Sequence, residues 1–242
     1  MNARDEVLAR IRSAHTAAPP TTLAYDDIAR DYRTNSDLDP DALMERLVER
    51  LLDYRALVRR VRADELPAAI AAALTERKAR SVVVPPGLDR SWVDAVGVDV
   101  QVDERNEPLS VARLDAVDAV LTGCAAAVAE TGTLVLDTSP DQGRRVITLI
   151  PDYHLCVVRA NQICADVPGA LTRLDGTRPL TMISGPSATS DIELDRVEGV
   201  HGPRTLEVII ISGGVAGRAP IVHPSAAVVE DPLRDGGGSA AQ

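Results

Sequence analysis

From Ser81 onward, short apolar runs alternate with turn-rich or helix-forming segments, and this alternation constrains the fold more than any other feature. The runs are rich in β-branched residues and apolar on both faces, which is typical of strands buried in a parallel sheet. They occupy residues 81–84, 98–102, 116–121, 134–136, 146–150, 155–158, 180–183 and 206–211. Helices are expected between several of them, at 91–96, 167–174 and 190–197. The pattern predicts an α/β fold with an open, largely parallel sheet flanked by helices.

The first 80 residues follow a helical pattern instead. Apolar residues recur at helical spacing over residues 2–18, so a short amphipathic helix is expected there. Asp39, followed by a proline, predicts the start of a long helix whose apolar face continues to Val61. A second helix is expected over residues 67–78. These helices are more consistent with the cover of a sheet than with a coiled coil, because the apolar stripe lasts only about three heptads.

These patterns predict a single domain in three parts. The parts are an N-terminal helical segment and arm that packs on the core (1–80), an α/β core (81–212) and a loose C-terminal tail rich in Gly, Pro and Ala (213–242). The arm includes the polar, turn-rich stretch 21–39, which can lie over the domain or over a partner.

Charge and hydropathy argue against two classes of partner. A net charge of -10 leaves no concentrated basic face for a phosphate backbone, so nucleic-acid binding is not expected. The sequence has no run of about 18 apolar residues and no basic-then-apolar leader, so we expect a cytoplasmic protein without membrane insertion.

Cysteine and histidine usage indicates that this chain alone carries no metal or cluster. Cys124, Cys156 and Cys164 lie in apolar segments without a C-x-x-C pair, as buried free thiols usually do, and a cubane iron-sulfur cluster usually needs four thiolates. The histidines are too scattered for a zinc motif; they are His15, His154, His201 and His223.

Two motifs place charged residues beside apolar runs. Glu130, followed by Thr131 and Gly132, lies at the junction of two apolar segments. There it can act as a nucleophile or general base, while Gly132 lets the backbone approach a ligand closely. The alternative is that Glu130 is a solvated or hydrogen-bonded hairpin residue. In the second motif, Asp141-Gln142-Gly143-Arg144-Arg145, the paired arginines can orient an anionic substrate, or be ordinary surface charge.

Two further motifs combine small and polar residues. The stretch from Ser184 to Asp191 reads as strand, small-residue loop and helix start, so we expect it to bind an anion through backbone amides, or else simply to cap a helix. Its candidate ligand-binding residues are Ser184, Gly185, Ser187 and Thr189. In the stretch 199–204, His201 lies between glycines, where it can titrate near neutral pH or be merely exposed, and Arg204 can complete an anion pocket.

Taken together, these motifs resemble the lactate-utilisation (LUD) domain family. The resemblance rests on Ala-Glu-Thr-Gly-Thr at 129–133, Asp-Gln-Gly-Arg-Arg at 141–145, Ser-Gly-Pro-Ser-Ala-Thr-Ser-Asp-Ile-Glu at 184–193 and Gly-Val-His-Gly-Pro-Arg at 199–204. It is specific over roughly residues 115–212 and weak before residue 80. It implies a fold like the NagB/RpiA/CoA-transferase group and a role in oxidising L-lactate to pyruvate beside iron-sulfur partner proteins, which would carry the clusters.

Three functions remain open at this stage. The first is an accessory or ligand-binding subunit of a lactate-oxidising system, with a small carboxylate or nucleotide-like ligand held by Arg145 or Arg204. The second is an independent enzyme of the CoA-transferase or sugar-phosphate isomerase type that uses Glu130. The third is a regulatory or structural protein with an acidic docking surface. Glu130, the loop from Ser184 to Asp191 and Arg204 are expected to converge on one cleft at the carboxyl ends of the central strands.

Overall fold

The computed structural model describes residues 3–17, 27–29, 38–94, 96–189, 197–198 and 202–212. The chain divides into two compact units, Met1–Arg33 and Thr34–Gln242. The first contains helix α1 (Ala3–Ala17), which confirms the expected N-terminal helix and buries none of its residues. The tail at 213–242 and most of the stretch 21–39 lie outside the described residues.

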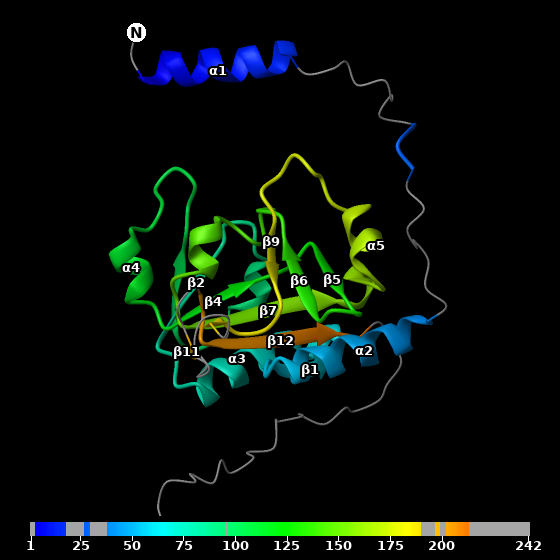
Figure 1. Ribbon diagram of the computed structural model, residues 1–242. Coiled ribbons are helices and arrows are strands. Elements are labelled where there is room, and N and C mark those ends of the chain that lie inside the picture. Colours follow the sequence, from blue (N-terminus) through cyan, green and yellow to red (C-terminus); the bar gives the residue numbers. More distant parts are fainter. Residues whose placement is uncertain are drawn as a thin grey trace, which may run out of the picture. The chain divides into compact units, whose positions relative to one another are not determined.

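A six-stranded sheet forms the centre of the second unit (Figure 1). Its order is β1-β12-β7-β4-β2-β3, and every neighbouring pair is parallel. The strands are β1 (Leu57–Val61), β2 (Ser81–Val84), β3 (Asp99–Val102), β4 (Ala119–Thr122), β7 (Tyr153–Arg159) and β12 (Thr205–Ile211). The prediction of an α/β fold with a parallel sheet is confirmed.

A second, four-stranded sheet has the order β8-β5-β6-β9 and mixes parallel and antiparallel pairs. Its strands are β5 (Ala126–Val128), β6 (Thr133–Leu136), β8 (Ile163–Cys164) and β9 (Thr181–Ile183). Two short strands, β10 (Ala188–Thr189) and β11 (Val197–Glu198), pair antiparallel with each other. The apolar runs at 134–136 and 180–183 therefore form strands, but outside the parallel sheet.

The described helices of this unit are short apart from two. The α-helices are α2 (Pro40–Asp53), α3 (Leu66–Glu76), α4 (Val111–Asp115) and α5 (Val167–Leu171), and the 3-10 helices are η2 (Ala63–Glu65), η3 (Arg90–Trp92), η4 (Arg145–Thr148) and η5 (Ala160–Gln162). Helix α2 begins as predicted, because the side chain of Asp39 accepts a hydrogen bond from the amide of Ala42 at 2.8 Å and a proline follows it.

The parallel sheet is covered on both faces. Helix α3 packs on one face through Ile70 and Leu74, with Trp92 beside it. The second sheet lies over the other face (Figure 1). Its apolar side chains form one buried cluster with Leu47 and Leu51 of α2 and with this face of the parallel sheet. Burial on both faces explains why the central strands are apolar throughout.

Four local predictions differ from the structure. The helix expected to reach Val61 ends at Asp53, because Arg55 adopts a left-handed φ of 64° and turns the chain into β1. The run 146–150 forms η4 rather than a strand, with Ile147 buried and Leu149 exposed. Helices at 91–96 and 167–174 are shorter than expected. The helix expected at 190–197 lies outside the described residues except for Val197, which is in β11.

Candidate ligand-binding pocket

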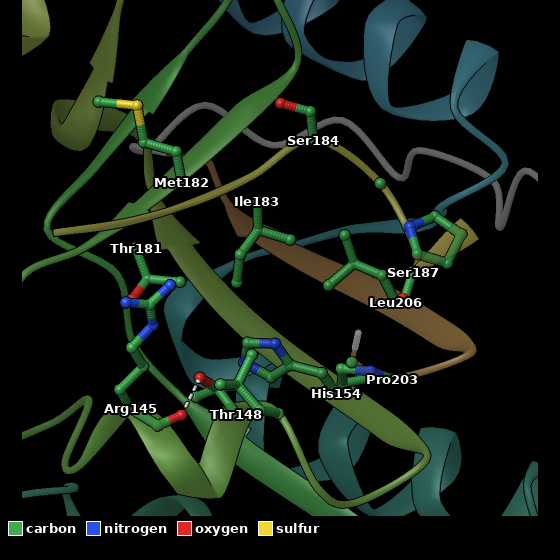
Figure 2. Close-up of a pocket in the computed structure, with 14 residues that line it drawn as sticks. Arg145, Thr148, His154, Thr181, Met182, Ile183, Ser184, Ser187, Pro203 and Leu206 are labelled. Carbon is green, nitrogen blue, oxygen red and sulfur yellow. Dashed lines mark hydrogen bonds between the residues drawn. The ribbon is translucent and has the colours of Figure 1, made fainter. Parts of the chain in front are cut away.

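A pocket of about 230 Å³ lies at the amino ends of β7 and β12 (Figure 2). Its lining comes from η4, β9 with its following loop, and the starts of the two strands, and comprises Arg145, Thr148, Leu149, His154, Thr181, Met182, Ile183, Ser184, Gly185, Pro186, Ser187, Gly202, Pro203 and Leu206. The lining thus mixes apolar side chains with a few polar groups, which is the composition of a small-ligand site.

Arg145 and Arg144 have different roles. The guanidinium of Arg144 donates two hydrogen bonds to the buried carboxylate of Asp103, at 2.7 and 2.6 Å, and this partner raises the pKa of Arg144. Arg145 is exposed, lines the pocket and forms no ion pair with any described residue. Of the two candidate arginines, Arg145 is therefore the one available to an anionic ligand.

His154 is a pocket residue that the sequence reasoning missed. It is 1% exposed, and its Nε2 lies 2.8 Å from Oγ1 of Thr122 on β4. Its Nδ1 is buried without a hydrogen-bond partner among the described residues. Burial lowers the pKa of His154 to about 4, so the imidazole is neutral at pH 7. The available signal was a polar residue inside an apolar run, where an unpaired polar group is costly.

The loop after β9 brings Ser184, Gly185 and Ser187 to the pocket lining, but several of its polar groups form hydrogen bonds within the protein. Ser184 shares a 2.8 Å hydrogen bond with the hydroxyl of Thr133, and the amide of Ser187 donates to the carbonyl of Pro203 at 2.8 Å. Gly185, with a φ of 93°, lets the loop approach helix α2, since an added Cβ would lie 2.7 Å from Cβ of Tyr54. Thr189 is in β10, so no helix begins at that residue.

Glu130 lies in the turn between β5 and β6, which matches the hairpin alternative. Its side chain is exposed and is not part of the pocket lining, while its amide donates to the carbonyl of Ala165 at 3.0 Å. Thr131 belongs to a hydroxyl chain that continues through Thr133 to Ser184. Gly132, with a φ of 62°, packs against Arg50 of α2 rather than admitting a ligand.

Two of the remaining candidates, Gln142 and Arg204, do not line the pocket. The buried side chain of Gln142 accepts a hydrogen bond from the amide of Asp137 at 2.6 Å, which is a structural role. Arg204 pairs with Asp152 and borders a second depression, which also includes Arg77. His201 lies outside the described residues.

The predicted convergence on one cleft at the carboxyl ends of the strands is wrong for the described residues. Arg145 and the loop 184–187 meet at the amino ends of β7 and β12 instead. The reason is that β9 belongs to the second sheet and η4 is not a strand, so their flanking motifs do not follow the polarity of the parallel sheet.

Within the described ranges, no group of three or more His, Cys, Asp or Glu side chains is placed to hold a metal ion. The three cysteines are buried free thiols, and the pKa of Cys124 is raised by its contact with Cys156 and by burial. None of the helices seen in those ranges has the length and apolarity needed to cross a membrane.

Fold and pocket define an α/β protein with a small pocket of mixed polar and apolar lining between its two sheets. Comparison with known proteins is more specific: the chain belongs to the LUD domain family, whose pattern matches residues 44–211. It is 47% identical over 213 residues to lactate utilization protein C of Deinococcus radiodurans, covering 86% of this chain and 95% of that protein.

Two other relatives agree with this assignment. The chain is 31% identical over 179 residues to lactate utilization protein C of Halalkalibacterium halodurans, covering 67% of this chain and 76% of that protein. A crystal structure of a DUF162 family protein from Deinococcus radiodurans matches with a TM-score of 0.63 and 46% identity, covering 72% of this chain and 99% of that one.

Proposed function

We propose that this protein is a ligand-binding subunit of an L-lactate-oxidising system and acts with iron-sulfur partner proteins. The observation that carries the proposal is the 47% identity to a lactate utilization protein C, which extends over nearly the whole length of both chains. The family resemblance adds a NagB/RpiA/CoA-transferase-like fold to the proposal, and the absence of a long apolar run from the sequence adds a cytoplasmic setting.

The pocket has the chemistry for a small carboxylate. Arg145 offers a planar set of donors that matches a carboxylate, and no described residue competes for it as an ion-pair partner. Ile183, Leu206 and Leu149 provide apolar wall for a short carbon chain. A volume of about 230 Å³ holds several water-sized groups of about 30 Å³, so a three-carbon acid fits.

Electron transfer is assigned to the partners in this proposal. In this proposal the chain would hold the acid, and iron-sulfur clusters on the partner proteins would take up the two electrons released when the hydroxyl becomes a carbonyl, while the two protons pass to water. In this proposal the three cysteines of this chain are core residues and not ligands of an iron-sulfur cluster. All three are buried, and two of them belong to the group of apolar core side chains that packs against α2.

The competing function, an independent CoA-transferase- or isomerase-like enzyme that uses Glu130, has no observation in its favour. A nucleophilic carboxylate must reach the substrate, and Glu130 is exposed on a turn outside the pocket. The lactate-utilisation proposal is therefore the one that the pocket supports.

The test is to purify the tagged full-length chain from its own cells grown on L-lactate, and to measure iron and L-lactate-dependent dye reduction in the eluate. We expect iron and activity to co-elute with the wild-type chain. Arg145→Ala should keep the iron but lose most of the activity. Arg105→Ala, an exposed arginine in the loop after β3, should keep both. An iron-free eluate, or full activity in Arg145→Ala, would overturn the proposal.

A further inference from the structure

The second depression, of about 330 Å³, lies at the amino ends of β7 and β12 but on the opposite face of the parallel sheet from the pocket. Successive residues of a strand point to opposite faces. Tyr153 and Thr205 line the depression on the side of α3, whereas the next residues, His154 and Leu206, line the pocket. The sheet therefore separates the two sites. The rest of the depression is lined by Arg77, Lys78, Ala79, Asp118, Asp152 and Arg204.

Both carboxylates of this lining have partners within the chain. Asp118 accepts hydrogen bonds from the amides of Arg80 and Ser81 at 2.8 and 3.1 Å. Asp152 forms an ion pair with Arg204 in which both side chains are more than half exposed. Because such an exposed pair contributes little to stability, an anion of higher charge can compete with Asp152 for the guanidinium of Arg204.

Two cations of the lining have no carboxylate partner. Arg77 and Lys78 are exposed and form no ion pair with any described residue. The guanidinium of Arg77 lies 5.9 Å from the ring centroid of Tyr153, and the hydroxyl of that ring donates to the buried Glu207. The ring is thus fixed, and it holds Arg77 at the wall of the depression. The amide of Lys78 donates to the carbonyl of Thr75 at 2.9 Å, which fixes the backbone of the lysine.

We propose that the second depression binds a phosphate group, either free or in a small monoester, through Arg77, Lys78 and Arg204. A phosphate monoester carries a charge of about −1.5 to −2 at pH 7 and has three strong acceptor oxygens. Each of the three cations can therefore donate a charge-assisted hydrogen bond to it. A carboxylate has one charge and two oxygens, so it satisfies this set of donors less completely. The site is new relative to the proposed function and does not depend on it.

Two electrostatic effects oppose this anion, and both are weaker than the contacts. Helix α3 ends at Glu76 beside the depression, and the negative end of its dipole repels an anion. This repulsion is modest and falls off within the last turn of the helix. The net charge of -10 also repels an anion, but charges more than about 8 Å away are largely screened at physiological ionic strength. The three adjacent cations therefore decide the binding.

The test is calorimetric titration of the full chain with inorganic phosphate, glycerol phosphate and acetate. We expect both phosphates to bind on the order of tenfold more tightly than acetate, the effect of one further hydrogen bond to a charged group. Tighter binding of glycerol phosphate than of inorganic phosphate would identify a monoester as the ligand, and the reverse would identify the free ion. Arg77→Gln and Lys78→Gln should each weaken phosphate binding on the order of tenfold. Arg105→Gln, at an exposed arginine outside the lining, is the matched control and should bind as wild type does.

A second readout needs no substitution. Lys78 is the sole lysine of the chain, so its acetylation by an amine-reactive reagent can be followed in one peptide by mass spectrometry. Saturating phosphate should slow this reaction several-fold, and an unchanged rate would overturn the inference. Phosphate binding that survives in both Arg77→Gln and Lys78→Gln would overturn it as well. If Arg145→Ala abolishes phosphate binding while Arg77→Gln retains it, the anion lies in the pocket and the second site is wrong.

Discussion

Arg59 on β1 and Glu207 on β12 form a buried ion pair between adjacent parallel strands. Arg59 also donates two hydrogen bonds to Glu76 of α3, and the hydroxyl of Tyr153 on β7 donates to Glu207 at 2.8 Å. Burial alone would lower the pKa of Arg59, but the bonds to Glu76 and Glu207 outweigh it and raise the pKa. The network joins three strands of the sheet to the helix that covers them.

Breaking this network from one side should destabilise the fold strongly. Glu207→Ala leaves Arg59 and the Tyr153 hydroxyl with a lost partner in the interior, and we expect a loss of about 3 to 5 kcal/mol in the free energy of unfolding, measured by urea denaturation. Asp152→Ala is the matched control, because its ion pair with Arg204 is exposed and should contribute at most about 1 kcal/mol. Equal losses in the two variants would show that the buried network does not stabilise the sheet.

The neighbouring arginines should respond differently to the same substitution. Arg144→Ala leaves the buried carboxylate of Asp103 without its cation, so we expect a loss of about 3 kcal/mol or more in stability. Arg145→Ala should change stability by less than about 0.5 kcal/mol, because it is an exposed residue away from a structural contact. Thermal and urea denaturation of both variants test this, and a large loss in Arg145→Ala would mean that it is structural rather than ligand-binding.

Gly185 should tolerate a side chain less well than Gly97, although both have positive φ angles. At Gly97 (φ 68°) an added Cβ meets nothing within 4 Å, so Gly97→Ala should cost only the backbone strain of about 1 to 2 kcal/mol. At Gly185 the Cβ would also lie 2.7 Å from Cβ of Tyr54, which should add about 1 to 3 kcal/mol. Comparing the urea midpoints of the two variants checks this, and similar values would mean that the loop after β9 moves freely from α2.

The buried His154 should make the fold sensitive to acid. Its pKa is about 4 in the folded chain, whereas an unperturbed histidine, as in the unfolded chain, has a pKa of 6.5. Between these two pH values the unfolded chain therefore binds a proton that the folded chain does not. The contribution of the neutral ring is fully present above pH 6.5 and is lost as the pH falls through 4. Between pH 7.5 and pH 5, wild type should lose about 2 kcal/mol more stability than His154→Phe. Denaturation of both at the two pH values measures the difference, and a difference of zero would mean that His154 is solvated.

Local pattern predicted much of the secondary structure because its cause is local. The β-branched residues of 81–84 form strand β2 with the predicted bounds, and Asp39 caps α2 through the amide of Ala42. The strand β1 was missed because Val58 and Val61 are spaced for a helix as well as for a short strand. The left-handed turn at Arg55 that separates the two elements has no signal in the apolar spacing.

The sequence by itself determined the alternating pattern of an α/β protein, the four motifs of the LUD family, and the small set of residues from which a site can be built. Only the tertiary structure decided which of those residues meet. Arg144 is used by Asp103, 41 positions away, and His154 pairs with Thr122, 32 positions away. Such contacts depend on the strand order and on which sheet each strand joins. Residue types and spacing therefore suggested Glu130 and both arginines equally, whereas packing of distant segments left Arg145 and His154 at the pocket.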